Sequence, residues 1–416
     1  MTFPSRYSFI TLIILFASNA CTDTRVIDEE AKSRLDSELK AFVDEGRVAG
    51  TSALIYEDGK EVYFNAFGYE DQENGLEMDR KTIALIYSMT KPITGTALMQ
   101  QYEQGKFSLD DPLEDYLPEY QNIQVFEGFD EHGDPMLTHP KRTLTIRDIT
   151  RHTSGFANDT NTPYVGEILA ETAPMNPDHS LAEFSEKLAT IPLVFHPGEQ
   201  WYYGMSVDVQ ARLVEVLSGQ PFDEYLRQHI LDPLGMDETR FVVPESEWER
   251  ISSLYQKGED GALKQLPDES AHSFNRTEHA LTPGGWGLTS TLDDYMKFAQ
   301  MLVHQGTRNG VQILKPETVE LMATNQLSDE VTERLWLPSK GQVGFGIDFA
   351  VRTKPAQGPD ENVGMVGEFF WDGAASTLFW VDPVNDITAV FFVQIFPFDG
   401  QLHKRFRDAV YGAYTE

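Results

Sequence analysis

Segments with the pattern of β-strands stand at both ends of this chain, and a long irregular stretch separates them. Residues 51–71 read as a β-hairpin, because two runs of β-branched and aromatic residues meet at Asp58-Gly59, a pair that favours tight turns. Four further strand-like segments lie near the C-terminus, at residues 343–351, 362–370, 376–383 and 386–394. We expect the strands from both ends to form one antiparallel sheet.

The rest of the chain is mostly helical in pattern. Residues 26–48 have helical periodicity with acidic residues in the first turns, and residues 402–414 close the chain with another helical pattern. The stretch from roughly 113 to 288 is mainly helical, with loops marked by proline and glycine. We therefore predict an α+β fold, with an antiparallel sheet flanked by helices and a mainly helical subdomain.

The first residues have the order of an export signal. Arg6 precedes the apolar run "FITLIILFA" and the small-residue sequence "SNAC", and the run is too short to span a bilayer comfortably. The pattern resembles a bacterial lipoprotein signal, which implies lipid attachment at Cys21. Ser18 stands where that motif usually has leucine, so simple cleavage at the same small residues is the alternative. We predict a signal at 1–20, a linker at 21–26 and a folded domain at 27–416.

The charge and the cysteine count exclude several classes of protein. With 33 basic and 66 acidic residues, the formal net charge is −33, which argues against binding to nucleic acid or to anionic membrane surfaces. A single cysteine excludes an intramolecular disulfide and a paired-thiol metal site. We expect an exported protein, periplasmic or anchored to the outer membrane only through its lipid, monomeric and without metal or cofactor.

Ser88 and Lys91 stand three residues apart in "SMTKPITG", at the start of a helical pattern. A serine hydroxyl needs a base within hydrogen-bond reach, and positions three apart share a helical face. A lysine amine in a desolvated site can serve as that base or as a proton relay. Pro92 agrees with a helix that begins near Ser88, where the serine N–H is free to form half of an oxyanion hole.

The spacing alone is weak evidence, because the chain has it twice. Ser37 and Lys40 in "DSELK" have the same separation on a charged, exposed helical pattern, and we expect no function there. Two other segments offer partners for Ser88. Tyr202 and Tyr203 stand before a helical pattern, and Gly373 opens a small-residue segment that lets a backbone N–H approach a ligand.

Six blocks of sequence, in order along the chain, carry a family resemblance. They are "SMTKPITG", "GKFSLDDPLEDYLPEY", "IRDITRHTSGF", "HPGEQWYYGMSVDV", "PGGWGLTSTLDDYMKFAQML" and "FFWDGAAST". Together they resemble the serine β-lactamase and penicillin-binding-protein superfamily, with the closest similarity to the esterase-like branch related to class C β-lactamases. The resemblance covers roughly residues 30–410 and implies the β-lactamase/transpeptidase-like fold.

The resemblance also implies roles for individual residues. Ser88 would be the acylated nucleophile, Lys91 its base or relay, and Tyr203 the tyrosine that passes protons to the leaving group. The third motif of the family maps to Trp371-Asp372-Gly373. The N–H groups of Ser88 and Ala374 would then form the oxyanion hole.

The departures from the family pattern bear on the substrate. Met205 stands where β-lactamases of this branch have asparagine, and Trp371 replaces the lysine that holds the antibiotic carboxylate. Asp372 adds a negative charge, which we expect to repel an incoming carboxylate. A third motif that begins with tryptophan resembles that of the family's carboxylesterases. We therefore expect a serine hydrolase that acts on short-chain esters.

The sequence alone leaves several other functions open. They are a β-lactamase, a D-stereospecific peptidase or DD-carboxypeptidase, an acyltransferase, and a non-catalytic envelope binding protein. We expect His152 to have a packing or capping role rather than to act as a base. Phe156 and Trp286 are candidates, with Met205 and the third motif, for the walls of a pocket that takes a small ester or amide.

Overall fold

The computed structural model describes residues 25–415 of the chain. The predicted signal at 1–20 and the predicted lipidation site Cys21 lie outside the described residues. Among the helices of residues 25–415, none is both long enough and apolar enough to span a membrane.

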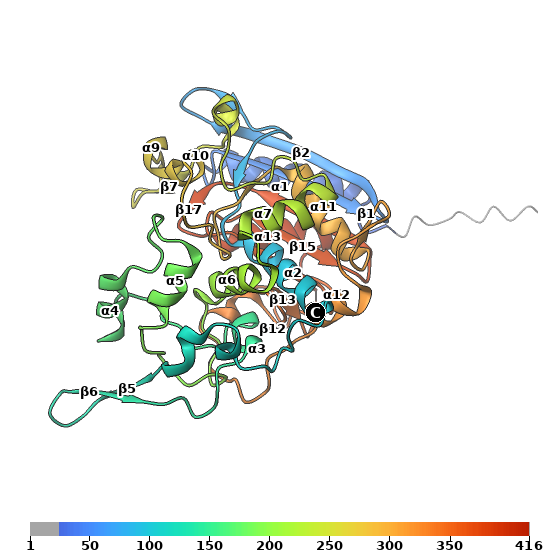
Figure 1. Ribbon diagram of the computed structural model, residues 1–416. Coiled ribbons are helices and arrows are strands. Elements are labelled where there is room, and N and C mark those ends of the chain that lie inside the picture. Colours follow the sequence, from blue (N-terminus) through green and yellow to red (C-terminus); the bar gives the residue numbers. More distant parts are fainter. Residues whose placement is uncertain (1–24, 416) are drawn as a thin grey trace, which may run out of the picture.

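One eight-stranded sheet forms the centre of the fold, with the strand order β12-β13-β14-β15-β16-β1-β2-β3 (Figure 1). The two ends of the chain meet where β1 and β16 pair antiparallel, with Ala53 opposite Phe391. Because every pair in the sheet is antiparallel and helices cover it, the predicted α+β fold is confirmed. Its strands are β1 (Gly50–Glu57), β2 (Lys60–Asp71), β3 (Leu76–Glu77), β12 (Val343–Phe345), β13 (Ala350–Arg352), β14 (Phe369–Asp372), β15 (Leu378–Asp382) and β16 (Ile387–Phe392).

The predicted hairpin is confirmed at Asp58-Gly59, where both residues have positive φ angles, 51° and 66°. Such angles suit a two-residue turn between twisted strands. Two predicted strands near the C-terminus are shorter than expected. Residues 343–351 form two strands because Asp348, with φ 59°, reverses the chain between them. The predicted strand at 362–370 begins only at Phe369, after a positive-φ glycine at Gly367.

Helices pack on both faces of the sheet through aromatic side chains. On one face, Phe391 of β16 contacts Phe42 of α1 (Glu29–Asp44) at 6.2 Å and Phe406 of α13 (Gly400–Tyr411) at 4.7 Å between ring centroids. On the other face, Phe379 of β15 contacts Tyr295 of α11 (Leu292–Val303) at 4.9 Å. The two terminal helices therefore cover one face together, as Figure 1 shows.

A second group of helices lies beside the sheet and packs around α6. This helix contacts α2, α3, α5 and α7. In Figure 1 the β5–β6 hairpin projects from this side of the molecule. Within residues 113–288 helices outnumber the strands of two small hairpins, but loops make up more than half of the stretch, so it is less helical than predicted. The subdomain boundary stays a prediction. The helices here are α2 (Thr90–Glu103), α3 (Ile146–Thr150), α4 (Val165–Thr172), α5 (Leu181–Leu188), α6 (Ser206–Ser218), α7 (Phe222–Leu226), α8 (Asp232–Leu234), α9 (Asp268–Ala271) and α10 (Ser273–Arg276).

Short elements connect these parts. The helical ones are η1 (Tyr87–Met89), η2 (Leu113–Asp115), η3 (Pro118–Asn122), η4 (Arg227–Leu231), η5 (Glu245–Arg250), η6 (Leu337–Lys340) and α12 (Pro316–Met322). The strands are β4 (Ala84–Leu85), β5 (Val125–Phe129), β6 (Pro135–Thr138), β7 (Tyr255–Lys257), β8 (Leu263–Gln265), β9 (Thr289–Ser290), β10 (Thr307–Arg308), β11 (Val311–Gln312) and β17 (Ile395–Phe396). The pairing of β4 with β9 matters most for the site, because it joins the segment before Ser88 to residues far along the chain.

Candidate active site

Ser88 lies in η1, a single 3₁₀ turn that leads directly into α2. The helix predicted to begin near Ser88 is present, with its α-helical part starting at Thr90. Two contacts hold the turn in place. The Ile86 N–H donates to the Leu288 carbonyl at 3.2 Å, and the Tyr295 hydroxyl donates to the Met89 carbonyl at 2.7 Å. The turn is therefore fixed on both sides of Ser88.

Lys91 is buried beside Ser88, with only 5% of the residue exposed. Its Nζ lies 3.3 Å from Ser88 Oγ and donates to the Gly285 carbonyl at 2.7 Å. The same atom lies 4.5 Å from the centre of the Tyr203 ring. The structure thus brings together the three side chains that the sequence singled out. In contrast, Ser37 is exposed on α1 and Lys40 pairs with Asp44, as expected for the second copy of the spacing.

Gly285 is a site residue that the sequence analysis missed. A Cβ atom at this position would lie 3.2 Å from Lys91 Nζ and 2.9 Å from an Asp208 carboxyl oxygen, so a side chain would crowd both groups. The Gly285 N–H donates to Asp208 Oδ1 at 2.9 Å, while its carbonyl accepts from Lys91. One glycine therefore links a buried carboxyl group to the buried amine. The glycine pair in "PGGWG" was the available signal.

Two buried carboxyl groups surround this amine. Burial raises the pKa of Asp208, and the charge of Lys91 opposes that effect. Burial also raises the pKa of Asp348 well above its ordinary range, against the opposing effects of the Gln210 hydrogen bond and of Lys91. Within the described residues, Lys91 forms no ion pair with either group. The amine is thus left with neutral acceptors, Ser88 and Gly285, rather than with a direct carboxylate partner.

The ring of Tyr203 covers Lys91, but its hydroxyl has a different partner from the one predicted. Trp371 Nε1–H donates to the Tyr203 hydroxyl oxygen at 3.1 Å, and the hydroxyl makes no hydrogen bond to Ser88 or Lys91 within the described residues. The ring also packs against Trp336 at 5.1 Å. Because the hydroxyl oxygen accepts from Trp371, its own hydrogen is free to point elsewhere in the site.

His152 has the packing role that was predicted for it. The ring is buried 4.7 Å from the Tyr203 ring and 5.4 Å from Phe345, and neither ring nitrogen has a hydrogen-bond partner within the described residues. Burial lowers the pKa of His152 well below its ordinary value, and the nearby charge of Lys91 acts in the same direction. Its backbone carbonyl accepts from the Tyr202 N–H at 2.9 Å, which helps to set the position of Tyr203.

The third motif, Trp371-Asp372-Gly373, ends beside η1, the turn that holds Ser88. Strand β14 closes at Asp372, and a Cβ atom on Gly373 would lie 2.6 Å from the Ile86 carbonyl oxygen, two residues before Ser88. A tight turn follows, in which the Ser376 N–H donates to the Gly373 carbonyl at 2.9 Å. Ala374 is exposed within this turn, and its N–H has no partner in the described part of the chain. This arrangement suits the predicted oxyanion hole of Ser88 and Ala374.

Asp372 does not add the unbalanced negative charge that was expected. Its carboxylate forms a buried ion pair with Lys340, and only 6% of Asp372 is exposed. Lys340 Nζ also lies 4.2 Å from the ring centre of Phe398 and 5.3 Å from that of Trp336. The expectation of a repulsive carboxylate is therefore wrong. Lys340 lies 32 positions before Asp372, and no local pattern joins the two.

The other predicted pocket residues divide into two groups. Met205 and Phe156 are buried, and Phe156 packs against Tyr120 at 5.5 Å, so core packing accounts for both. Trp286 is half-buried beside Gly285 and contacts Phe274 at 4.5 Å. Trp336, which the sequence analysis missed, lies closer to the site than Phe156 because it contacts both Tyr203 and Trp371.

Comparison with known proteins agrees with this geometry. The family model for beta-lactamase matches residues 35–412. The chain belongs to the beta-lactamase family. It is 33% identical to Protein Rv1367c of Mycobacterium tuberculosis, over 86% of this chain and 89% of that protein. It is 28% identical to lovastatin esterase of Penicillium rubens, over 92% of this chain and 98% of that enzyme.

A solved structure shows the same fold. EstCE1, described as a hydrolase with promiscuous acyltransferase activity, superimposes with a TM-score of 0.75 at 24% identity, over 93% of this chain and 100% of its own. The predicted β-lactamase/transpeptidase-like fold and the predicted serine hydrolase class are both confirmed. Among residues 25–415, this beta-lactamase-family chain has no group of three or more His, Cys, Asp or Glu side chains arranged to hold a metal ion.

Replacing Lys340 tests the buried ion pair. We expect Lys340→Met to lower the free energy of unfolding by about 3–5 kcal/mol, because it leaves the Asp372 carboxylate buried without its partner. Adding Asp372→Asn should recover much of that loss, and Lys404→Met, at a more exposed pair with Asp408, should cost about 1 kcal/mol or less. Urea unfolding followed by circular dichroism measures all three. Equal losses for Lys340→Met and Lys404→Met would contradict the buried-pair interpretation.

Acid should destabilise the protein through its buried imidazoles. Burial lowers the pKa of His403 from 6.5 to about 4 and that of His152 well below 6.5. An unfolded histidine takes up a proton below about pH 6.5 while the buried ring stays neutral, so stability is complete above that pH and falls as the pH drops toward 4.

We expect His152→Phe to reduce the slope of unfolding free energy against pH between 6.5 and 4 by up to about 1.4 kcal/mol per pH unit. His132, which is exposed on the β5–β6 hairpin, supplies the matched control in His132→Phe, and its slope should equal that of the parent. Urea titrations at several pH values give the slopes, and an unchanged slope for His152→Phe would contradict the prediction.

Proposed function

We propose that this member of the beta-lactamase family is a carboxylesterase that acts on short-chain esters through an acyl-enzyme on Ser88. The observation that carries the proposal is the approach of Lys91 Nζ to Ser88 Oγ, at 3.3 Å, inside a buried site that also holds the Tyr203 ring. A serine becomes a useful nucleophile when a base lies at this distance. Ser37, in contrast, is exposed on α1, and Lys40 pairs with Asp44 instead.

In the first half of the proposed reaction, Ser88 Oγ attacks the ester carbonyl carbon and forms the new C–O bond. Lys91 acts as the base or relay that takes up the serine proton, and the carbonyl oxygen takes the negative charge. The N–H groups of Ser88 and Ala374 donate to that oxygen. The tetrahedral intermediate then loses the alcohol, whose oxygen takes a proton through Tyr203.

In the second half, a water molecule attacks the acyl-enzyme carbonyl carbon and gives its proton to the same relay. The C–O bond to Ser88 breaks, the acid leaves, and Ser88 regains a proton. Trp371 supports both halves by donating to the Tyr203 hydroxyl oxygen, which leaves the phenolic hydrogen free for the reacting groups. The site thus needs only groups of the chain and water.

The third motif favours esters over β-lactams or peptides with a free carboxylate. Trp371 supplies an indole where a carboxylate-binding lysine would stand, and its N–H is already committed to Tyr203. The nearby cation, Lys340, is paired with Asp372. The two positions beside this motif that could hold a substrate carboxylate thus offer an indole and an amine that is already paired. The names of lovastatin esterase and of EstCE1, a hydrolase, agree with an ester substrate.

Acyl transfer is the second candidate, and one feature of the site favours it. Trp336 and Phe398 are 36% and 40% exposed on either side of Lys340, so the site is bordered by open aromatic surface. Such a surface can hold an alcohol in place of water, and the acyl-enzyme then passes its acyl group to that alcohol. EstCE1 is described as having both activities. Product ratios with butanol as the added acceptor measure the partition.

Substrate turnover tests the proposed function directly. We expect hydrolysis of p-nitrophenyl acetate and butyrate, with little or no turnover of nitrocefin or of a D-amino-acid peptide. Intact-mass analysis should show an acyl adduct on the parent, which Ser88→Ala abolishes along with activity, a loss of about a thousandfold or more. Ser37→Ala, at the second copy of the spacing, should keep full activity.

Two results would contradict this proposal. Full ester hydrolysis by Ser88→Ala would remove Ser88 from the reaction. Nitrocefin turnover at a rate equal to that of the esters would instead favour a β-lactamase. An unchanged circular dichroism spectrum of Ser88→Ala shows that the variant is folded. Its activity then reports on the role of Ser88 alone.

We also propose that the protein is exported and attached to a membrane through lipid on Cys21, and that it is a monomer. The order of charge, apolar run and small residues before Cys21 supports export and lipid attachment. Expression with radiolabelled palmitate should label the parent and leave Cys21→Ser unlabelled and released. Labelling of Cys21→Ser would contradict the assignment.

A further inference from the structure

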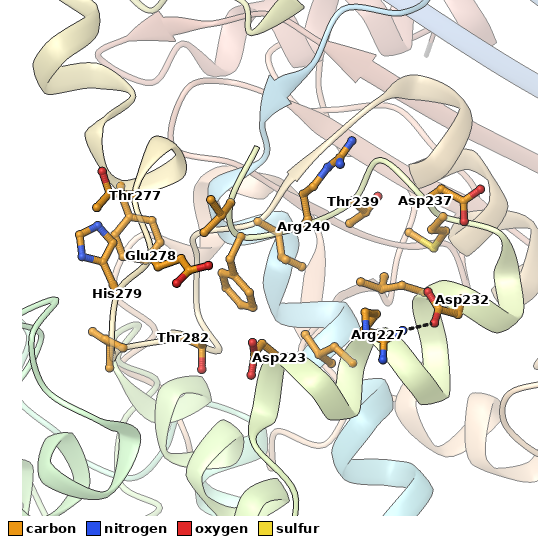
Figure 2. Close-up of a pocket in the computed structure, with 18 residues that line it drawn as sticks. Asp223, Arg227, Asp232, Asp237, Thr239, Arg240, Thr277, Glu278, His279 and Thr282 are labelled. Atoms are coloured by element: carbon orange, nitrogen blue, oxygen red, sulfur yellow. Dashed lines mark hydrogen bonds and ion pairs between the residues drawn. The ribbon is translucent and has the colours of Figure 1, made fainter. Parts of the chain in front are cut away.

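A cavity of about 640 Å³ lies on the helical side of the molecule, and none of Ser88, Lys91 or Tyr203 lines it. Figure 2 shows its walls, which come from α7 and η4, from the turn at 236–242 and from the segment at 274–288. The volume is in the range that small-molecule sites occupy in proteins. The cavity is therefore large enough for a ligand, and the proposed reaction does not use it.

The base of the cavity is apolar, whereas polar and charged side chains make up much of the rest of its lining. Leu226, Leu231, Met236, Leu281 and Leu288 are all buried and line it. A ligand that enters this cavity must therefore present mostly apolar surface to these side chains.

The edge of the cavity carries an excess of negative charge. Asp223, Asp237 and Glu278 are exposed there, and none of them forms an ion pair with another described residue. The two guanidinium groups at the cavity are already neutralised. Arg227 pairs with Asp232 at 2.6 Å, as Figure 2 shows, and Arg240 pairs with Glu247 at 2.7 Å. The charge left without a partner is thus that of the three carboxylates.

An aromatic surface borders the same edge. The Phe274 ring stacks on the His279 ring, with centroids 4.8 Å apart and planes 14° from parallel. Both residues line the cavity. The edge of the cavity therefore holds aromatic surface as well as the three carboxylates.

The cavity shares a wall with the candidate active site. Leu288 places its side chain in the cavity, while its carbonyl accepts from the Ile86 N–H at 3.2 Å and its N–H donates to Thr90 Oγ1 at 3.3 Å. Three residues earlier, Gly285 holds Lys91 through its carbonyl. One short segment therefore has the cavity on one side and Ser88 and Lys91 on the other.

We propose that this cavity is an accessory site for a small molecule with an apolar body and one amine group, and that its occupancy changes the active site through the segment 281–288. The apolar walls select the body of the ligand, and the three unpaired carboxylates select the cationic group. A carboxylic acid of the same size would meet like charges at the edge.

Three probes with one skeleton test the choice of ligand: 4-phenylbutylamine, 4-phenylbutan-1-ol and 4-phenylbutanoate. Calorimetric titration of the full-length protein should show the amine binding about tenfold more tightly than the acid, with the alcohol between them. Glu278→Gln and Asp223→Asn should each weaken amine binding about two- to fivefold. Glu317→Gln, an exposed carboxylate on α12, is the matched control and should change nothing.

Two further measurements place the binding in this cavity. Leu226→Trp should fill the apolar base of the cavity and abolish binding of all three probes. Glu278→Gln and Asp223→Asn test the same site at its exposed edge, without a change in the core. Ser88→Ala should bind the amine with the same affinity as the parent, so the binding measurement does not depend on ester turnover. Equal affinity for amine and acid, or unchanged binding in Glu278→Gln and Asp223→Asn, would overturn the proposal.

Steady-state kinetics test the connection to Lys91. The amine should change kcat for p-nitrophenyl acetate, by about twofold or more, in the parent and not in Leu226→Trp. A rise in KM alone, with kcat unchanged, would mean that the amine competes for the ester site and would overturn the shared-wall proposal.

Discussion

A buried lysine amine must keep hydrogen-bond acceptors, and the site of this chain is built around that requirement. Lys91 finds an acceptor in the Gly285 carbonyl, almost two hundred positions later in the chain. The pairing of β4 with β9 brings the two segments together, since it fixes Ile86 against Leu288. The position of Ser88 follows, because the serine turn lies between this pairing and the start of α2.

Much of the fold and part of the site follow from local patterns in the sequence. The Asp58-Gly59 turn predicts its hairpin because both residues tolerate positive φ angles. Ser88 and Lys91 could be predicted because a spacing of three residues and a helical start act at short range. Tyr203 needed the ordered family blocks, since nothing near it in the sequence points to Lys91.

The parts that the sequence did not predict depend on contacts between distant residues. Gly285 and Asp208 act on Lys91 from two other segments, and neither has a local signature beyond a glycine pair and an acid at a helix start. Lys340 pairs with Asp372 and neutralises the charge that was expected to repel a substrate carboxylate. Trp371, predicted only as a replacement for lysine, turns out to hold the Tyr203 hydroxyl.

The Lys340–Asp372 pair also determines what a substitution at position 371 would meet. Lys340 Nζ lies 5.9 Å from the centre of the Trp371 ring, so a lysine at position 371 would place a second ammonium beside a carboxylate that is already neutralised. It would also remove the indole N–H that holds Tyr203. A lysine at position 371 would therefore affect two contacts at once, the Lys340–Asp372 pair and the hydrogen bond to the Tyr203 hydroxyl.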